Sequence, residues 1–243
     1  MKRATFLLFS GLAYAFFLLT FVALIGFVAG GNLSPLSVDR GEAVSPVVAV
    51  IWDLGLIALF GLQHSVMARP GFKDRWTKLV PASLERSIFV VAASAALWIM
   101  YLLWKPVPLV VWSVEQPALA GVLWAVFGLG WLIVLASTFL IDHFELFGLR
   151  QALAFARKRA PRDPAFVTPF LYRIVRHPLY AGFLLAFWAN PRMTVGHFVF
   201  AAGMTAYVLV AIVYEERDLV ATFGDSYRRY QADVDKLVPR RLI

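Results

Sequence analysis

Four long apolar segments constrain the fold of this chain more than any other feature of its sequence. They cover roughly residues 5–29, 46–68, 87–104 and 118–141, the third being slightly short. A helix that crosses a bilayer needs about 20 mostly apolar residues, so each segment predicts a transmembrane span. Since 60% of the 243 residues are hydrophobic and only 16% are charged, lipid must be the solvent for much of the chain. The first segment is too long for a signal peptide and ends without a cleavage motif, so we expect it to be retained.

The apolar region 177–213 is harder to divide, because Asn190-Pro191-Arg192 interrupts it. The part before this interruption is about a dozen residues long, too short to span a bilayer upright. We therefore expect an all-α integral membrane protein with five or six transmembrane helices, in which 177–213 forms a C-terminal helical hairpin. No polar linker divides the chain, which predicts a single domain of residues 1–243.

Basic residues alternate between the loops. Loops 69–86 and 142–176 carry five and seven Lys or Arg residues, whereas loops 30–45 and 105–117 carry one each. Because basic loops face the cytoplasm, the amino end, the two basic loops and the carboxyl tail are predicted to lie there. The net charge of +8 then reflects residues beside anionic lipid headgroups and does not indicate nucleic-acid binding. The chain has no cysteine, which excludes disulfides, thiolate metal sites and a cysteine nucleophile.

The tail that follows residue 214 has a different pattern. Leu219, Phe223 and Val234 recur at near-helical spacing among charged residues. This spacing predicts an amphipathic helix at the cytoplasmic membrane surface. Loop 69–82 has a similar mixture and is a second candidate for such a helix.

Four polar clusters, distant in sequence, fall at one predicted membrane depth. They are Gln63 with His64; Asp142, His143 and Glu145; Arg176, His177 and Tyr180; and Glu215 with Glu216. Ionisable groups at this depth cost free energy unless they pair or serve a site. A simpler interpretation stays open for three of these clusters. His64 can be an interfacial histidine, Asp142-His143 a solvated helix end, and Glu215-Glu216 the start of the solvated tail. Asp53, inside the second span, is more economically explained as a structural hydrogen-bonding residue.

The segment RHPLY, residues 176–180, has the most specific pattern. Pro178 suits the first turn of a helix and keeps His177 out of helical geometry. His177 would then lie beside free backbone N–H groups at a helix N-terminus, which attract anions, and Arg176 adds a charged donor. Gly182 would let a flat ligand approach the backbone. With the glutamate pair of the returning arm opposite, the site suits a zwitterionic or polyhydroxylated cofactor.

These residues also carry a family resemblance. RHPLYAG, followed about thirty residues later by EERDL, resembles the cofactor region of membrane methyltransferases related to isoprenylcysteine carboxyl methyltransferase, over about residues 170–240. GLQHSVMARPGFK, STFLIDHFELFGLRQ, TPFLYRIVRHPLYAGFLLAFWANPRMTVGHFVFA and EERDLVATFGDSYRRY together resemble the bacterial methanethiol S-methyltransferases.

The resemblance implies S-adenosylmethionine (S-adenosyl-L-methionine) as methyl donor, a small thiol such as methanethiol as acceptor and dimethyl sulfide as product. It also implies a bacterial inner (cytoplasmic) membrane protein with its active site facing the cytoplasm. The residues that it places on the cofactor are Arg176, His177, Pro178, Leu179, Tyr180, Gly182, Glu215 and Glu216.

A thiol attacks far faster as its thiolate, so a proton acceptor is expected near the substrate. The candidates, in order, are His143 or Asp142, then His64, then Glu216. Apolar residues are candidates for a small substrate chamber: Phe139, Leu140, Phe183 and Trp188.

Three alternatives stay open at this point. The acceptor can be a larger lipid or prenyl thiol or carboxylate. A related RHP-type motif occurs in NADPH-dependent membrane sterol reductases, although this chain is short for one. A small transporter is disfavoured because the polar residues gather at one face instead of the midplane. Membrane lipids and the small thiol are the expected partners, nucleic acid is not, and the sequence leaves the oligomeric state open.

Overall fold

The computed structural model describes residues 2–31, 33–42, 44–160 and 166–239. Arg162, one of the basic residues counted in loop 142–176, lies outside the described residues. The chain forms two compact units, Met1–Pro108 with Asp142–Asp163 and Leu109–Ile141 with Pro164–Ile243. We call them unit 1 and unit 2. Because a helical membrane domain can contain two such units, the single domain of 1–243 stays a prediction.

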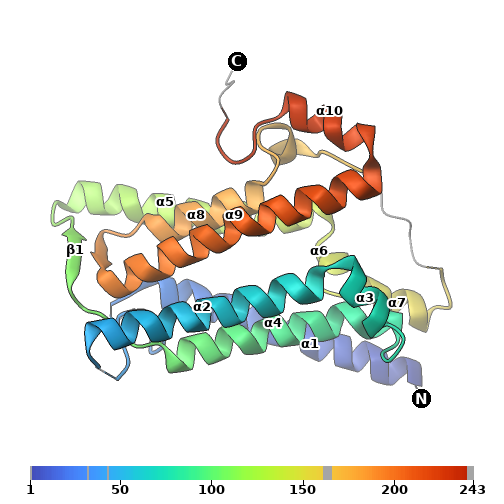
Figure 1. The fold of residues 1–243 in the computed structure, drawn as a ribbon, viewed down its shortest axis with the longest axis horizontal. Coiled ribbons are helices and arrows are strands. Elements are labelled where there is room, and N and C mark those ends of the chain that lie inside the picture. The colour runs from blue at the N-terminus through green and yellow to red at the C-terminus, as the bar shows by residue number, and fades with distance from the viewer. Residues whose placement is uncertain (1, 32, 43, 161–165, 240–243) are drawn as a thin grey trace. The chain divides into compact units, whose positions relative to one another are not determined.

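Unit 1 contains α1 (Lys2–Ala29), α2 (Pro46–Ala68), α3 (Pro70–Trp76), α4 (Ala82–Leu103), α6 (His143–Leu146) and α7 (Leu149–Ala156). Unit 2 contains β1 (Val110–Ser113), α5 (Pro117–Ile141), the 3-10 helix η1 (Phe170–Arg173), α8 (Pro178–Trp188), β2 (Arg192–Thr194), α9 (Val195–Phe223) and α10 (Asp225–Asp233). Figure 1 shows these elements.

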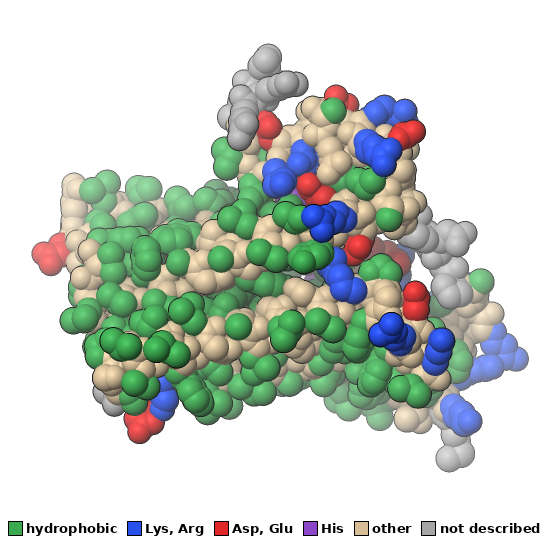
Figure 2. Space-filling view, in the orientation of Figure 1, with side chains coloured by type: hydrophobic (Ala, Val, Ile, Leu, Met, Phe, Trp, Pro, Cys, Tyr) green, Lys and Arg blue, Asp and Glu red, His purple; other side chains and the backbone are tan. Residues whose placement is uncertain are grey.

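Five helices of the described chain, α1, α2, α4, α5 and α9, are long and apolar enough to cross a membrane, and α8 is a shorter apolar helix. This confirms the all-α membrane fold. The third span begins at Ala82, earlier than the expected residue 87, because the charged side chains of Glu85 and Arg86 lie in its first turns. Figure 2 shows hydrophobic side chains along both units and basic side chains near α3 in unit 1 and near α10 in unit 2.

In unit 1, α4 packs against α1 and α2, and α7 packs on α1 and α4. The hydroxyl of Ser87 donates to that of Ser10 at 2.8 Å in the buried contact of α4 with α1. Arg86 Nε donates to the carbonyl of Leu146 at 2.6 Å, which ties the start of α4 to the end of α6. Gly148, with φ +87°, lies so close that a Cβ would be 2.8 Å from the Ser87 nitrogen. These contacts fix α6 and α7 at the basic end of unit 1.

The opposite end of unit 1 is tied by polar contacts to backbone. Asp53 is fully buried, and its Oδ1 accepts from the Lys105 amide at 3.0 Å. The Trp104 indole N–H donates to the carbonyl of Val38 at 3.1 Å. These contacts support the structural role expected for Asp53.

In unit 2, α5 and α8 lie side by side in very close contact (Figure 1). A Cβ on Gly182 would lie 2.7 Å from the Gly130 carbonyl oxygen, and a Cβ on Gly130 would lie 2.7 Å from the Gly182 carbonyl oxygen. Small residues are the usual means of bringing two membrane helices this close. The packing of α5 therefore positions α8 and, with it, residues 176–180.

The hairpin expected over 177–213 consists of α8 and α9, which pack together, but its first arm is only half helical. With 11 residues, α8 is about 16 Å long, and the chain continues as an extended segment that pairs through β2 with β1. The backbone N–H and C=O groups of an extended segment at membrane depth need hydrogen-bond partners from the protein, because lipid tails offer none. Here Trp112 Nε1 donates to the Asn190 carbonyl at 3.0 Å, and buried His197 Nε2 donates to the Phe187 carbonyl at 3.0 Å near the end of α8.

The tail differs from the expected single amphipathic helix. Helix α9 continues through the two glutamates to Phe223, and Gly224 (φ 57°) separates it from α10. Glu215 and Glu216 therefore lie inside a long helix, while α10 folds back against α9 (Figure 1). Segment 69–82 contains α3, whose Phe72 and Trp76 rings stack at 5.8 Å. The membrane-surface positions of α3 and α10 stay predictions.

Candidate active site

The start of α8 has the local geometry that the sequence predicts. Pro178 is the first residue of α8, and His177 precedes it with φ −125° and ψ 63°, outside the helical region. Proline supplies a fixed φ and needs no hydrogen-bond partner at this position, while it excludes the residue before it from the helix. The turn directs both Arg176 and His177 at Glu216 of α9.

Glu216 is the centre of a dense polar cluster. Its Oε1 accepts from Arg176 Nε at 2.8 Å and lies 3.0 Å from His177 Nε2. Its Oε2 accepts from Gln231 Nε2 at 3.1 Å and lies 3.8 Å from Lys236 Nζ. The side chains of Arg176, His177 and Glu216 are only 10%, 4% and 11% exposed, so the charge-assisted contacts among these three residues are largely shielded from water.

These contacts indicate that Glu216 holds the side chains of Arg176 and His177 in place within unit 2. Both of its oxygens already face donors of the chain itself, whereas the sequence expectation has Glu216 contacting the cofactor or accepting the thiol proton. Its contact with a cofactor and its role as a base stay predictions. The structure shows that it fixes Arg176 and His177.

The backbone amides at this turn are also occupied. The Arg176 amide donates to the Asp235 carbonyl at 2.8 Å, and the His177 amide donates to the Lys236 carbonyl at 3.1 Å. Val175 and Asp235 form an isolated parallel bridge. Since Pro178 has no N–H, residues 176–178 offer no backbone donor to a ligand. The anion site that the sequence predicts at the start of α8 therefore lacks these donors and stays a prediction.

Two groups beside the cluster have unused hydrogen-bonding capacity among the described residues. Arg176 Nη1 donates to the carbonyls of Gln231, at 2.9 Å, and Val234, while its Nη2 makes no hydrogen bond there. Glu215 Oε2 is buried, accepts no hydrogen bond there and lies 4.0 Å from His177 Nδ1. Arg176 Nη2 and Glu215 Oε2 thus offer a donor and a carboxylate oxygen near His177, and this combination suits a ligand with both a carboxylate and an ammonium group.

The other predicted cofactor residues lie on two sides of α8. The Tyr180 ring is 5.7 Å from the His177 ring, on the side of the cluster, and Leu179 is half-buried. Gly182 faces α5, where the Gly130 carbonyl occupies the space that a Cβ would need. Its lack of a side chain is thus explained by helix packing, and its predicted contact with a cofactor has no other support.

A shallow groove lies beside the cluster. It has a volume of about 380 Å³ and is lined by Val213, Glu216, Arg217, Val220, Gln231 and Lys236. This volume is within the range of small-molecule sites, about 300–1,000 Å³. The groove is lined by Glu216 itself and by two of its contacts, Gln231 and Lys236, so a bound molecule would lie against the cluster.

Asp142, in unit 1, is engaged in structural contacts. Its Oδ1 caps α6 by accepting from the Glu145 amide at 3.1 Å, and its Oδ2 pairs with Arg150 Nη1 at 2.6 Å. Both oxygens of the Asp142 carboxylate are therefore engaged by groups of unit 1. Of the predicted pair Asp142-His143, the histidine is better suited to accept a proton.

His143 is buried, with 3% of its surface exposed. The Tyr14 hydroxyl of α1 lies 2.8 Å from its Nε2, and the ring packs at right angles to Phe144 and edge-on to Phe147. Burial lowers the pKa of His143 below its usual value, with nearby Asp142 acting in the opposite direction. The imidazole is thus neutral at pH 7 and able to accept a proton.

His64 lies at the same end of unit 1. Its ring is 5.3 Å from Phe60 and 4.8 Å from Phe89. Phe89 belongs to one hydrophobic cluster with Phe147, the neighbour of His143. The structure therefore brings His64 and His143 to the borders of one cluster in unit 1, and it gathers Arg176, His177, Glu215 and Glu216 in unit 2.

The four apolar residues expected to form a chamber face different neighbours. Phe183 packs edge-on against Trp131 at 5.8 Å, whereas Trp188 packs on α9, where its indole donates to Thr205 at 3.0 Å. Phe139 is 57% exposed and Leu140 is half-buried, both on α5. This arrangement gives no support to a chamber formed by these residues.

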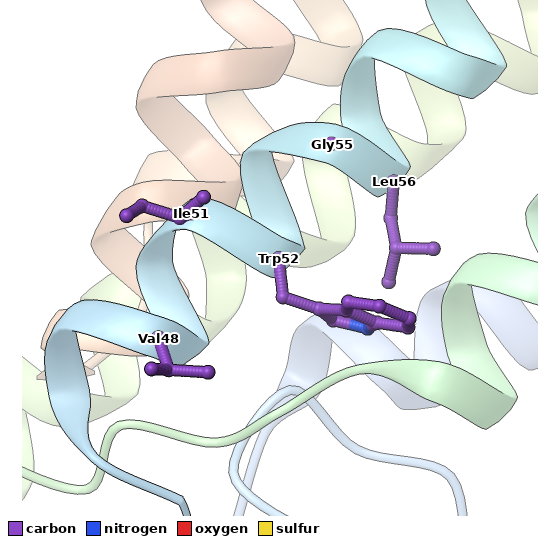
Figure 3. A pocket seen from close by; sticks show the side chains of 5 residues that line it. All are labelled: Val48, Ile51, Trp52, Gly55 and Leu56. Atoms are coloured by element: carbon purple, nitrogen blue, oxygen red, sulfur yellow. The ribbon is translucent and has the colours of Figure 1, made fainter.

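A second groove, of about 440 Å³, lies on α2 and is lined by Val48, Ile51, Trp52, Gly55 and Leu56. Figure 3 shows the Trp52 ring beside Leu56, below the bare backbone of Gly55. The Trp52 indole N–H is occupied by the Leu103 carbonyl at 2.9 Å. A site for a polar cofactor needs convergent polar groups, and this apolar lining supplies none.

Sequence reasoning missed four residues of these arrangements. Tyr14 lies in the middle of the first apolar segment, and His197 follows the short arm of the hairpin; neither is near a recognisable motif. Gln231 and Lys236 lie in the tail, which was expected to be one amphipathic helix at the membrane surface. Only the turn at Gly224 brings them to Glu216, and a single glycine among polar residues is a weak signal for such a turn.

Known proteins similar to this chain include a methanethiol S-methyltransferase of Pseudomonas sp. (strain GM41(2012)), 50% identical over 235 residues, which cover 97% of this chain and 90% of the relative. The methanethiol S-methyltransferase of Mycobacterium tuberculosis is 49% identical over 239 residues, 98% of each chain. Nurim of Bos taurus is 29% identical over 235 residues, which cover 85% of this chain and 87% of the relative. No family model and no solved structure matches the chain. With half of its residues identical over nearly the whole length, the chain belongs to the family of membrane methanethiol S-methyltransferases.

Proposed function

We propose that this integral membrane protein transfers a methyl group from S-adenosylmethionine to methanethiol and releases dimethyl sulfide. The observation that carries the proposal is the near full-length identity to relatives named for this activity. The clustering of Arg176, His177, Glu215 and Glu216 in unit 2 supports it independently, because the sequence alone predicts these residues as cofactor ligands.

The unused polar groups of this cluster fit the amino-acid end of S-adenosylmethionine. The Nη2 donors of Arg176 match its carboxylate, and the buried Oε2 of Glu215 matches its ammonium group. The first-turn amide of Leu179 adds a donor at the positive end of the helix dipole of α8. When bound, the cofactor supplies a sulfonium methyl group for attack by the thiol sulfur.

The chain must also accept the thiol proton, because a simple alkyl thiol is mostly protonated at neutral pH. His143 is the best of the predicted acceptors, because it is neutral and Tyr14 orients its imidazole. Asp142 holds α6, and thereby His143, in place through its N-cap contact. His64, packed between two phenylalanine rings, is the second choice.

We propose that the site faces the cytoplasm of a bacterial inner membrane. In unit 2, the cluster lies at the end formed by η1, the last turns of α9 and α10, which carry Arg173, Arg217 and Arg228 respectively. The opposite end of that unit contains the ribbon of β1 and β2. The positive-inside rule places the basic end in the cytoplasm, where S-adenosylmethionine is made, while methanethiol can reach the protein from the lipid.

The test is the conversion of methanethiol by membranes that contain the chain, supplied with S-adenosylmethionine carrying a deuterated methyl group. We expect labelled dimethyl sulfide in the headspace, a loss of at least tenfold in Arg176→Gln, and no loss in Arg229→Gln, whose side chain is exposed on α10. Formation of unlabelled product only, or equal activity of Arg176→Gln and wild type, would refute the proposal.

A further inference from the structure

The segment after α10 lies directly on the proposed cofactor residues. Residues Val234–Lys236, which we call the strap, run parallel to Val175–His177. Two strap carbonyls receive the backbone amides of Arg176 and His177, and a third, that of Val234, receives Arg176 Nη1. The strap thus fixes both the backbone and the guanidinium of the site.

Gln231 connects α10 to this arrangement from two directions. Its side-chain amide donates to Glu216 Oε2 at 3.1 Å, and its backbone carbonyl accepts from Arg176 Nη1 at 2.9 Å. Gln231 therefore contacts both members of the ion pair between Arg176 Nε and Glu216 Oε1, two atoms that lie 2.8 Å apart. It precedes the strap by three residues. A neutral amide suits this position, because an acid would add a second negative charge next to Glu216 and a base would compete with Arg176.

We propose that Gln231 is a positioning residue: it locks Glu216 and, through α10, the strap, so that Arg176 keeps Nη2 directed away from the chain's own acceptors and available to the cofactor carboxylate. This inference rests on the proposed function for the identity of the ligand. The hydrogen bonds through which Gln231 and the strap hold Glu216 and Arg176 are present in the protein without ligand, so their effect can be measured in that state.

The ligand-free readout is hydrogen exchange of the amides of Arg176 and His177 in detergent-solubilised protein. In the wild type these amides are protected, because Asp235 and Lys236 accept from them. In Gln231→Leu we expect their exchange to be about tenfold faster, the effect of losing one hydrogen bond to a charged group. Arg229→Gln, in the same helix but exposed, is the matched control and should exchange like the wild type.

Gln231→Glu provides a second variant of the same size. Two carboxylates about 3 Å apart repel each other while both are ionised, and a shared proton replaces the repulsion by a hydrogen bond. After correction for the intrinsic pH dependence of exchange, the extra exchange of this variant should therefore decrease as the pH is lowered through the acidic range. A purely structural defect would persist at every pH.

Activity separates the two proposals. For Gln231→Leu we expect the KM for S-adenosylmethionine to rise about tenfold while the KM for methanethiol is unchanged. Unchanged exchange at Arg176 and His177 in both Gln231 variants would overturn the positioning inference, even in an active enzyme. A wild type that forms no labelled dimethyl sulfide would refute the proposed function, while the exchange data would still decide whether Gln231 locks the site.

Discussion

The close contact of α5 with α8 predicts that one methyl group on Gly130 is strongly destabilising. In Gly130→Ala the new Cβ would lie 2.7 Å from the Gly182 oxygen and 2.7 Å from the Ala186 nitrogen, against 3.4 Å at the short end of ordinary contacts. Both atoms belong to backbone, so no side-chain rotation relieves the overlap, and the two helices must separate by about 0.7 Å. Overpacking of this kind costs about 1–3 kcal/mol.

Gly128→Ala is the matched control in the same helix, because nothing lies within 4 Å of the position that its new methyl group would take. Alanine favours helix by up to about 1 kcal/mol over glycine, so this variant should be neutral or slightly more stable. For chains of this size about 1 kcal/mol corresponds to about 2–4 °C, so we expect the thermal midpoint of Gly130→Ala to fall by about 2–12 °C.

The assay is the thermal midpoint of detergent-solubilised protein, followed by tryptophan fluorescence, together with methyl transfer at a permissive temperature. Since α8 carries His177 at its start, a shift of α8 should also weaken cofactor use in the Gly130 variant. Equal midpoints for Gly130→Ala and Gly128→Ala would refute the reasoning that this contact positions α8.

Three further predictions concern buried polar residues and use the same thermal assay. Burial lowers the pKa of His143. The neutral imidazole therefore contributes fully to stability above the ordinary histidine pKa of about 6.5, and this contribution is lost as the pH falls below that value. The thermal midpoint of the wild type should drop between about pH 7.5 and 5.5, and the midpoint of His143→Gln should drop less steeply. Equal slopes would contradict this. His197→Ala leaves the Phe187 carbonyl without its donor and should cost about 1–3 kcal/mol; an unchanged midpoint would show that the contact is dispensable. Asp53→Asn keeps an acceptor for the Lys105 amide and should be nearly neutral, whereas Asp53→Ala should cost about 1–3 kcal/mol; equal losses would mean that the carboxylate itself is required.

The parts of the fold that were predictable from sequence are those dictated by short-range chemistry. Continuous apolar composition identifies a span wherever it occurs, so α1, α2, α4 and α5 were expected to within about five residues, whereas α9 extends beyond the expected end at residue 213 to Phe223. Proline acts on its immediate neighbour, so the non-helical turn at His177 before α8 also followed from the residues themselves. The interruption Asn190-Pro191-Arg192 correctly divided the hairpin, but it did not reveal that the short arm is completed by an extended segment.

The contacts that arise from tertiary folding were not predictable in this way. A glutamate pair reads equally well as a cofactor ligand or as an internal partner, and only the position of α10 after Gly224 decides that Glu216 faces Gln231. Gly182 is similar: close approach to a ligand and close approach to α5 both require glycine, and the sequence contains nothing that separates them. Tyr14 is one aromatic residue among many in its span until α6 places His143 beside it.

The most direct test of the central claim is a calorimetric titration of S-adenosylhomocysteine, the demethylated cofactor, into detergent-solubilised protein. We expect saturable binding to the wild type and at least tenfold weaker binding to Glu215→Gln, which keeps the shape of the side chain but removes the charge of its buried oxygen. Arg229→Gln should bind like the wild type. Equal dissociation constants for wild type and Glu215→Gln would contradict the assignment of the cofactor site to the cluster around His177.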